Sequence, residues 1–231
     1  MVKVSSGDFK GAIKDYEKAL VSNTDIDVRL YLSMGSAYKH LENWKTSIVC
    51  LDKFIKLCPN EAIGYLWRGL VKSRMIKDID AIKDFSKAIK LDKNCAVAYA
   101  HRGSTKGFIN DYKGSIEDLN KAIELIPDYA MAYGSRGIAK YRLENFQGAL
   151  EDFNKAIELD ENDAYIYHWR GTAKGNLKDY NGAIEDFNRA IELDTNFTQT
   201  YFSRGMIKLY FKDYEGAAED FSKSPFIFPC L

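Results

Sequence analysis

The sequence is poor in the residues that interrupt regular structure. Its 231 residues include only four prolines and sixteen glycines, which leaves little material for the turns of a strand-rich fold. No apolar run approaches the roughly 20 residues that a membrane helix needs, and residues 1–10 lack the apolar core of a signal peptide. These absences predict a cytoplasmic protein without membrane contact.

Charge of one sign and reactive residue clusters are also missing. Lys and Arg number 33 and Asp and Glu number 33, so no basic excess favours nucleic acid. The four cysteines are scattered without histidines at metal-ligand spacing, which indicates reduced thiols. No glycine-rich phosphate loop follows a strand, and His40, His101 and His168 are far apart along the chain. We therefore expect no nucleic-acid partner, no cofactor, no metal and no enzymatic activity.

What the chain does contain is self-similarity at a period of 34 residues. An aromatic, a glycine and a second, mostly aromatic position recur in register, which chance does not produce. The first series is Tyr31, Tyr65, Tyr99, Tyr133, Tyr167 and Tyr201. The second is Gly35, Gly69, Gly103, Gly137, Gly171 and Gly205. The third is Trp44, Asp78, Tyr112, Phe146, Tyr180 and Tyr214.

Within one unit the pattern predicts a helix, a turn and a second helix. In the unit 164–197, a polar stretch with one aromatic, Lys178 to Asn181, separates two segments of helical periodicity. Gly171 and Ala183 are small, which predicts that the two helices approach closely there. The apolar stripe of the second helix is Ala183, Ile184, Phe187, Ala190 and Ile191.

These positions resemble the tetratricopeptide repeat (TPR) family: an aromatic at unit position 4, Gly at 8, an aromatic at 17 and Ala at 20. The resemblance implies an all-α, right-handed α-solenoid superhelix of stacked helix-turn-helix units, with the first helices lining a concave groove. Family numbering places the six repeats at 28–61, 62–95, 96–129, 130–163, 164–197 and 198–224. In the first of them Phe54 stands where the family has alanine, and we expect it to push its neighbours apart.

The two ends depart from a complete unit. Residues 1–27 predict a partial repeat with only its second helix, so either a first helix was lost or the chain is a piece of a longer protein. Residues 225–231 form an apolar tail in which Pro225 stops the last helix. This tail could fold back on the last helix, bind a neighbour or mark a truncation.

A charged series runs through five of the repeats. Arg at unit position 7, Lys at 11 and Asp at 23 are all absent from the first full repeat, which has Met34, Tyr38 and Cys50 instead. Their joint loss predicts one structural network between helices, because unpaired charges in a helix interface are costly. An anion-binding ladder is the alternative, and the pairing of each Asp within its repeat or with a neighbour stays open. The residues are Arg68, Lys72, Asp84, Arg102, Lys106, Asp118, Arg136, Lys140, Asp152, Arg170, Lys174, Asp186, Arg204, Lys208 and Asp220.

The family resemblance also carries over a groove, at unit positions 2, 5, 9, 12 and 13. These positions are mostly apolar and aromatic here, which suits an extended peptide or an amphipathic helix. Leu66 and Leu70 stand where the carboxylate clamp of chaperone-binding members needs polar residues, so a chaperone C-terminal tail is not expected. The predicted groove residues are Leu66, Leu70, Arg74, Phe108, Met131, Ile138, Tyr141, Arg142, Tyr165, His168, Asn176, Phe202 and Tyr210.

The sequence thus predicts a non-enzymatic scaffold for protein–protein interaction, with a protein or peptide ligand in the concave groove. Two alternatives remain. The uncapped ends could stack end to end, which would make the chain a self-assembling homo-oligomer. The array could also be the docking arm of a larger multidomain enzyme.

Overall fold

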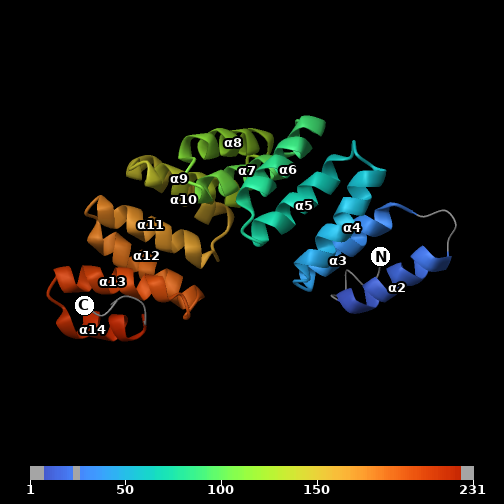
Figure 1. Cartoon of the computed structure of the whole chain (residues 1–231). Coiled ribbons are helices and arrows are strands. Elements are labelled where there is room, and N and C mark those ends of the chain that lie inside the picture. Colours follow the sequence, from blue (N-terminus) through green and yellow to red (C-terminus); the bar gives the residue numbers. More distant parts are fainter. Residues whose placement is uncertain (1–7, 23–26, 225–231) are drawn as a thin grey trace. The chain divides into compact units, whose positions relative to one another are not determined.

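The computed structural model describes residues 8–22 and 27–224, and every regular element in these ranges is an α-helix (Figure 1). The predicted apolar tail 225–231 and the first seven residues lie outside the described residues. The all-α solenoid class predicted from the repeats is confirmed. The helices are α2 (Phe9–Ser22), α3 (Arg29–His40), α4 (Trp44–Leu57), α5 (Ala62–Arg74), α6 (Asp78–Leu91), α7 (Ala96–Phe108), α8 (Tyr112–Leu125), α9 (Ala130–Arg142), α10 (Phe146–Leu159), α11 (Ala164–Asn176), α12 (Tyr180–Leu193), α13 (Thr198–Tyr210) and α14 (Tyr214–Ser222).

The contacts divide the chain into two compact units. Unit 1 carries α2 to α7 and unit 2 carries α8 to α14, with the division between Asp111 and Tyr112. Within each unit every helix packs against the next one along the chain. Each unit also brings first helices of successive repeats together, as in α3 with α5 and α11 with α13. Stacking therefore buries the apolar faces that one helix pair leaves open.

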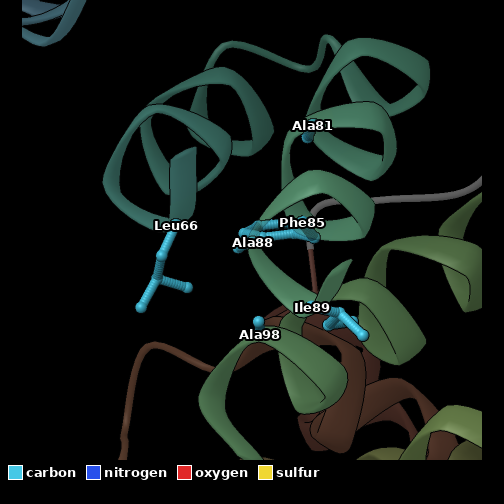
Figure 2. Close-up of a cluster of buried hydrophobic side chains, with 6 residues drawn as sticks. All are labelled: Leu66, Ala81, Phe85, Ala88, Ile89 and Ala98. Atoms are coloured by element: carbon cyan, nitrogen blue, oxygen red, sulfur yellow. The ribbon is translucent and has the colours of Figure 1, made fainter. Parts of the chain in front are cut away.

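The close approach inside a helix pair depends on the recurrent glycine. A Cβ on Gly137 of α9 would lie 2.6 Å from the ring of Phe153 on α10, and Gly171 faces Phe187 in the same way. The ring of each phenylalanine is buried, and Figure 2 shows Phe85 of α6 in a buried cluster of unit 1 that also contains Leu66, Ala81, Ala88, Ile89 and Ala98. The predicted role of the glycines in helix packing is confirmed.

The turn inside each helix pair contains a left-handed residue, and in most of the described pairs a side-chain cap follows it; Lys77, before α6, provides no such cap. The residue at unit position 15 has φ between 56° and 66° and is not glycine in any repeat. Where the next residue is Asp or Asn, its side chain caps the second helix: the Asp179 carboxylate accepts the backbone N–H of Gly182, and Asn145 and Asp213 act alike. The left-handed residues are Glu42, Ile76, Asn110, Glu144, Lys178 and Lys212.

Phe54 is accommodated without the expected separation of its neighbours. Its side chain is buried, and the facing residue at position 3 of the next repeat is Gly64. A Cβ on Gly64 would lie 2.7 Å from Cδ1 of Phe54, so the missing side chain provides the room that the large ring takes up. The prediction missed this because the two changes fall in different repeats.

A matched pair of glycine substitutions tests the packing. Gly137→Ala forces a methyl group into the Phe153 ring and is expected to destabilise unit 2 by about 1–3 kcal/mol. Gly175→Ala gains the same helix propensity but meets no atom nearer than 3.8 Å, so it should stabilise by about 0.5–1 kcal/mol. Urea unfolding followed by circular dichroism measures both. Equal shifts in the two variants would contradict the proposed contact.

Candidate functional site

A charged spine joins the two helices in four of the repeats that the structure describes. Arg170 of α11 makes two parallel hydrogen bonds to Asp186 of α12, from Nε at 2.9 Å and from Nη2 at 2.6 Å. The same bidentate pair joins Arg68 to Asp84, and it recurs at positions 136 with 152 and 204 with 220. The structure thus answers what the sequence left open, since in these four repeats each Asp pairs with the Arg of its own repeat.

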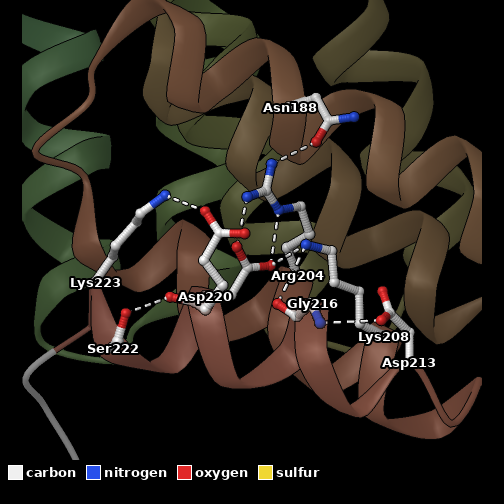
Figure 3. Close-up of polar contacts among 9 residues, drawn as sticks. Asn188, Arg204, Lys208, Asp213, Gly216, Asp220, Ser222 and Lys223 are labelled. Carbon is white, nitrogen blue, oxygen red and sulfur yellow. Dashed lines mark hydrogen bonds and ion pairs between the residues drawn. The ribbon is translucent and has the colours of Figure 1, made fainter.

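The same arginine reaches back to the preceding repeat. Nη1 of Arg204 donates to Oδ1 of Asn188 at 2.6 Å, and Asn188 lies on α12 of the repeat before (Figure 3). Arg170 contacts Asn154 equivalently, and Arg102 donates to Ser86. The guanidinium group therefore connects its own helix pair with the one before it.

The lysine at unit position 11 completes the network around the buried carboxylate. Lys208 Nζ lies 3.0 Å from Oδ2 of Asp220 and also donates to the backbone carbonyl of Gly216 (Figure 3). Burial alone would raise the pKa of Asp220, but the hydrogen bonds from Arg204 and Lys208 outweigh it, and the pKa is lowered. Two cations therefore hold one buried carboxylate in its charged form.

The first full repeat replaces this network with apolar packing. Met34 and Cys50 are buried where the later repeats have Arg and Asp, and burial raises the pKa of the Cys50 thiol. Tyr38, in the place of the lysine, donates its hydroxyl to Glu17 of α2. The same helix-pair geometry is thus built both with and without the charges.

A second surface feature is a hollow in unit 2, formed by first helices. It has a volume of about 410 Å³ and lies between α11 and α13, with Arg142 from the end of α9 and Ser224 near the end of the described chain. A shallower hollow of about 260 Å³ continues past Phe202 and Ser203, which line both. The walls of the first hollow are Arg142, Tyr165, His168, Trp169, Thr198, Gln199, Phe202, Ser203 and Ser224.

Trp169 is central to the aromatic wall. Its ring makes edge contacts with Tyr141 at 5.2 Å and Tyr165 at 6.0 Å, and the guanidinium group of Arg142 lies 5.2 Å from its centroid. Its indole Nε1 is buried and has no hydrogen-bond partner in the part of the chain that the structure describes. The sequence did not predict Trp169 as a site residue, because unit position 6 is not among the groove positions of the family. The presence of a large aromatic residue at this position was the one sign in the sequence that could have indicated it.

The predicted groove residues divide by exposure. Two of them are buried, which corrects the expectation that they offer free surface. Leu66 packs with Phe85 and Ala98 (Figure 2), and His168 lines the hollow although its side chain is almost fully buried. The exposed ones are Arg74, Phe108, Arg142, Tyr165, Asn176 and Tyr210. The half-buried ones are Leu70, Met131, Ile138, Tyr141 and Phe202. In unit 2 the structure brings Arg142, Tyr165, His168 and Phe202 to one hollow.

His168 has an environment that keeps it neutral. Burial lowers its pKa to about 4, and its Nδ1 lies 3.1 Å from Oγ1 of Thr200. The rings of Trp169, Phe187 and Phe197 surround the imidazole. The hollow is therefore lined in part by a neutral imidazole that is bonded to a buried hydroxyl.

Within the described residues, no group of three or more His, Cys, Asp or Glu side chains could hold a metal ion. Cys50, Cys58 and Cys95 are free thiols, and Cys230 lies outside the described residues. The helices that the structure describes are too short or too polar for any of them to cross a bilayer.

Removing one carboxylate from the spine tests its energetics. Asp186→Asn leaves Arg170 and Lys174 partly buried without their counter-charge, and it should cost about 3–5 kcal/mol of unfolding free energy. The triple variant Arg170→Met, Lys174→Tyr, Asp186→Cys copies the residues of the first full repeat and should lose far less. Chemical denaturation of both variants gives the comparison. A triple variant as unstable as the single one would refute the view that the charges form one unit.

The neutral His168 predicts a dependence of stability on pH. Its folded pKa of about 4 lies below the ordinary 6.5, so between these values the unfolded chain binds a proton that the folded chain does not. The free energy of unfolding therefore falls as pH falls through this window. Above pH 6.5 the imidazole is neutral in both states, so its titration no longer changes the free energy of unfolding. Between pH 7.5 and 5, His168 should account for a loss of about 2 kcal/mol.

The measurement is urea unfolding at pH 7.5 and pH 5 for wild type and His168→Gln. Burial also lowers the pKa of His101, to about 4, and that of His40, so the variant should keep the part of the slope due to these two residues and lose the part due to His168. An unchanged slope in the variant would contradict a buried neutral His168.

The comparisons with solved structures agree with this architecture. The Cut9–Hcn1 hetero-tetramer of the APC/C superposes with a TM-score of 0.83 at 17% identity, over 95% of this chain and 43% of that chain. A tetratricopeptide repeat protein from Parabacteroides merdae ATCC 43184 gives a TM-score of 0.77 at 18% identity, over 96% of this chain and 88% of that one. YrrB, a TPR protein with an unusual peptide-binding site, gives 0.60 at 24% identity, over 75% and 90%. At these identities the likeness shows the fold.

The sequence itself matches a known family, although no curated protein matches it. Models described as tetratricopeptide repeat match residues 28–61, 96–129, 130–163 and 164–197. These ranges coincide with units of the 34-residue period and with the helix pairs of the structure. Proteins with these repeats are in general non-enzymatic interaction scaffolds. The chain belongs to the tetratricopeptide repeat family.

Proposed function

We propose that the chain is a non-enzymatic scaffold that binds an extended peptide or an amphipathic helix on the face formed by its first helices. The observation that carries the proposal is the hollow of unit 2, with its aromatic wall and the cation of Arg142. A volume of about 410 Å³ suits a few side chains of a ligand. Exposed aromatic surface of this kind usually marks a contact site.

The polar groups of the hollow suit a peptide backbone. Gln199 and Ser203 provide a side-chain amide and a hydroxyl beside the rings of Tyr165 and Phe202. No carboxylate contributes to the described wall, and His168 is engaged with Thr200, so an acid–base pair is not at hand. The likeness in fold to YrrB, which has a peptide-binding site, supports the same class of ligand.

Two matched double variants test the proposal. Arg142→Ser with Tyr165→Ser removes one cation and one aromatic ring from the hollow. Arg189→Ser with Tyr214→Ser removes the same two residue types from the second helices α12 and α14. A peptide selected on the wild type from a random 12-residue library should bind the first variant at least about 10-fold more weakly and the second unchanged, because exposed aromatic and Arg contacts dominate binding energy.

Fluorescence polarisation of the labelled peptide gives the affinities, and circular dichroism confirms equal helical content. Equal binding by both variants would place the ligand elsewhere. A selection that yields no peptide, together with a mass by light scattering that grows with concentration, would favour the self-assembly alternative. A catalytic domain encoded next to this chain would favour the docking-arm alternative.

A further inference from the structure

Acidic residues are distributed unequally between the two helices of each repeat. The first helices α3, α5, α7, α9, α11 and α13 contain no Asp or Glu at all. Every described second helix from α4 to α14 contains at least one. Apart from Arg29 at the start of α3, the Lys and Arg residues of the first helices are of two kinds: those of the spine, which pair with Asp across the helix interface, and a few at unit positions 12 and 13.

In unit 1 these other cations gather on adjacent first helices. The ammonium group of Lys39, near the end of α3, lies 4.4 Å from the ring centroid of Trp67 on α5. Arg74 is the last residue of α5, and α5 packs against both α3 and α7. Lys39 is half-buried and Arg74 is exposed, so both charges can be reached from solvent.

The positive groups are close enough to affect one another. Burial and then the charge of Arg74 lower the pKa of Lys39. Burial, followed by the charges of Arg74 and Lys39, lowers the pKa of His101 on α7 to about 4. Neither Lys39 nor Arg74 has an ion pair with a carboxylate of the described chain. Like charges held together without a counter-charge create a site of positive potential.

We infer that Lys39 and Arg74, beside the indole of Trp67, bind the carboxylate side chains of an acidic peptide segment. Two cations and an adjacent ring suit one or two carboxylates next to an apolar side chain. A nucleic acid would need a longer stripe of cations to follow its phosphates, and the chain as a whole has no net charge. The surface lies in unit 1 and is separate from the hollow of unit 2, so it stands whether or not that hollow binds a peptide.

The arrangement recurs independently in unit 2. Arg142 lies over Trp169 as Lys39 lies over Trp67, and both tryptophans occupy unit position 6 of the following repeat. In unit 2 the neighbouring imidazole, His168, is buried and bonded to Thr200, and no second free cation joins the pair in the described wall of the hollow. Unit 1 is therefore the place where charge dominates recognition.

The test starts from the full chain carrying Arg142→Ser and Tyr165→Ser, so that the unit 2 hollow contributes nothing. A random 12-residue peptide library is selected on this chain, on the same chain with Lys39→Gln and Arg74→Gln, and on a control with Lys53→Gln and Lys87→Gln. The control lysines belong to the second helices α4 and α6 and lie over the rings of Tyr31 and Tyr65. The control therefore loses the same charge in a similar setting.

Asp and Glu should be enriched about 2-fold or more in peptides selected on the parent and on the control, and not on the Lys39 and Arg74 variant. The strongest acidic peptide and its twin with Gln for Glu and Asn for Asp are then compared by calorimetry. The twin should bind the parent about 10-fold more weakly, and the two peptides should bind the variant alike. Charge reversal, Lys39→Glu with Arg74→Glu, should select Lys and Arg instead, which a misfolded chain would not do.

Three outcomes would overturn the inference. Peptides selected on the parent could be no more acidic than the library, or the acidic preference could persist in the Lys39 and Arg74 variant. A 20-residue oligothymidylate could also bind the parent more tightly than the acidic peptide, which would assign the site to nucleic acid.

Discussion

The arginine at unit position 7 is the contact on which the stacking of this chain depends. A single helix pair cannot bury its own apolar face, so the structure needs a device that sets how each pair lies on the one before. The guanidinium group of Arg204 fits that need, because its planar donors engage Asp220 of its own pair and Asn188 of the preceding pair at once. Both contacts must be made together, which allows little freedom in the stacking.

The spine also determines where acidic residues lie. Each network carboxylate comes from a second helix, so the spine cations of the first helix are neutralised across the helix interface. The opposite side of the first helix then needs no acid of its own, and none is present. The free cations Lys39, Arg74 and Arg142 therefore keep their charge available, and a partner can supply the carboxylates.

The first full repeat shows that the charges are not required for a helix pair to form. Met34 and Cys50 bury apolar side chains at the equivalent places, and apolar replacement of a buried ion pair is often neutral or stabilising. The retention of the network in later repeats is therefore better explained by the alignment it imposes than by net stability. Ser47, whose hydroxyl donates to the carbonyl of Gly35, gives the first repeat a simpler bond between its two helices.

Much of the fold could be predicted from the sequence, because glycine and phenylalanine 16 residues apart specify a close helix pair wherever they recur. The left-handed turn residues could not, since the repeat geometry imposes this conformation on residues such as Ile76 that do not favour it. The candidate site was predicted less well, because exposure at a groove position depends on the residue facing it. Leu66 faces Ala98 and Ile89 and is buried, whereas Tyr165 at another groove position stays exposed.

The two surfaces illustrate how one repeated framework can present different chemistry. Gly, Phe and the charged spine hold the backbone of each repeat, so the residues at unit positions 2, 5, 6, 12 and 13 can differ without disturbing it. Around Trp169 the surroundings are rings, neutral polar groups and the single cation of Arg142, which discriminate mainly by shape. Around Trp67 they are uncompensated cations, which discriminate by charge. Specificity in this chain therefore resides in the residues that break the repeat, and conformity to the repeat explains only the scaffold that carries them.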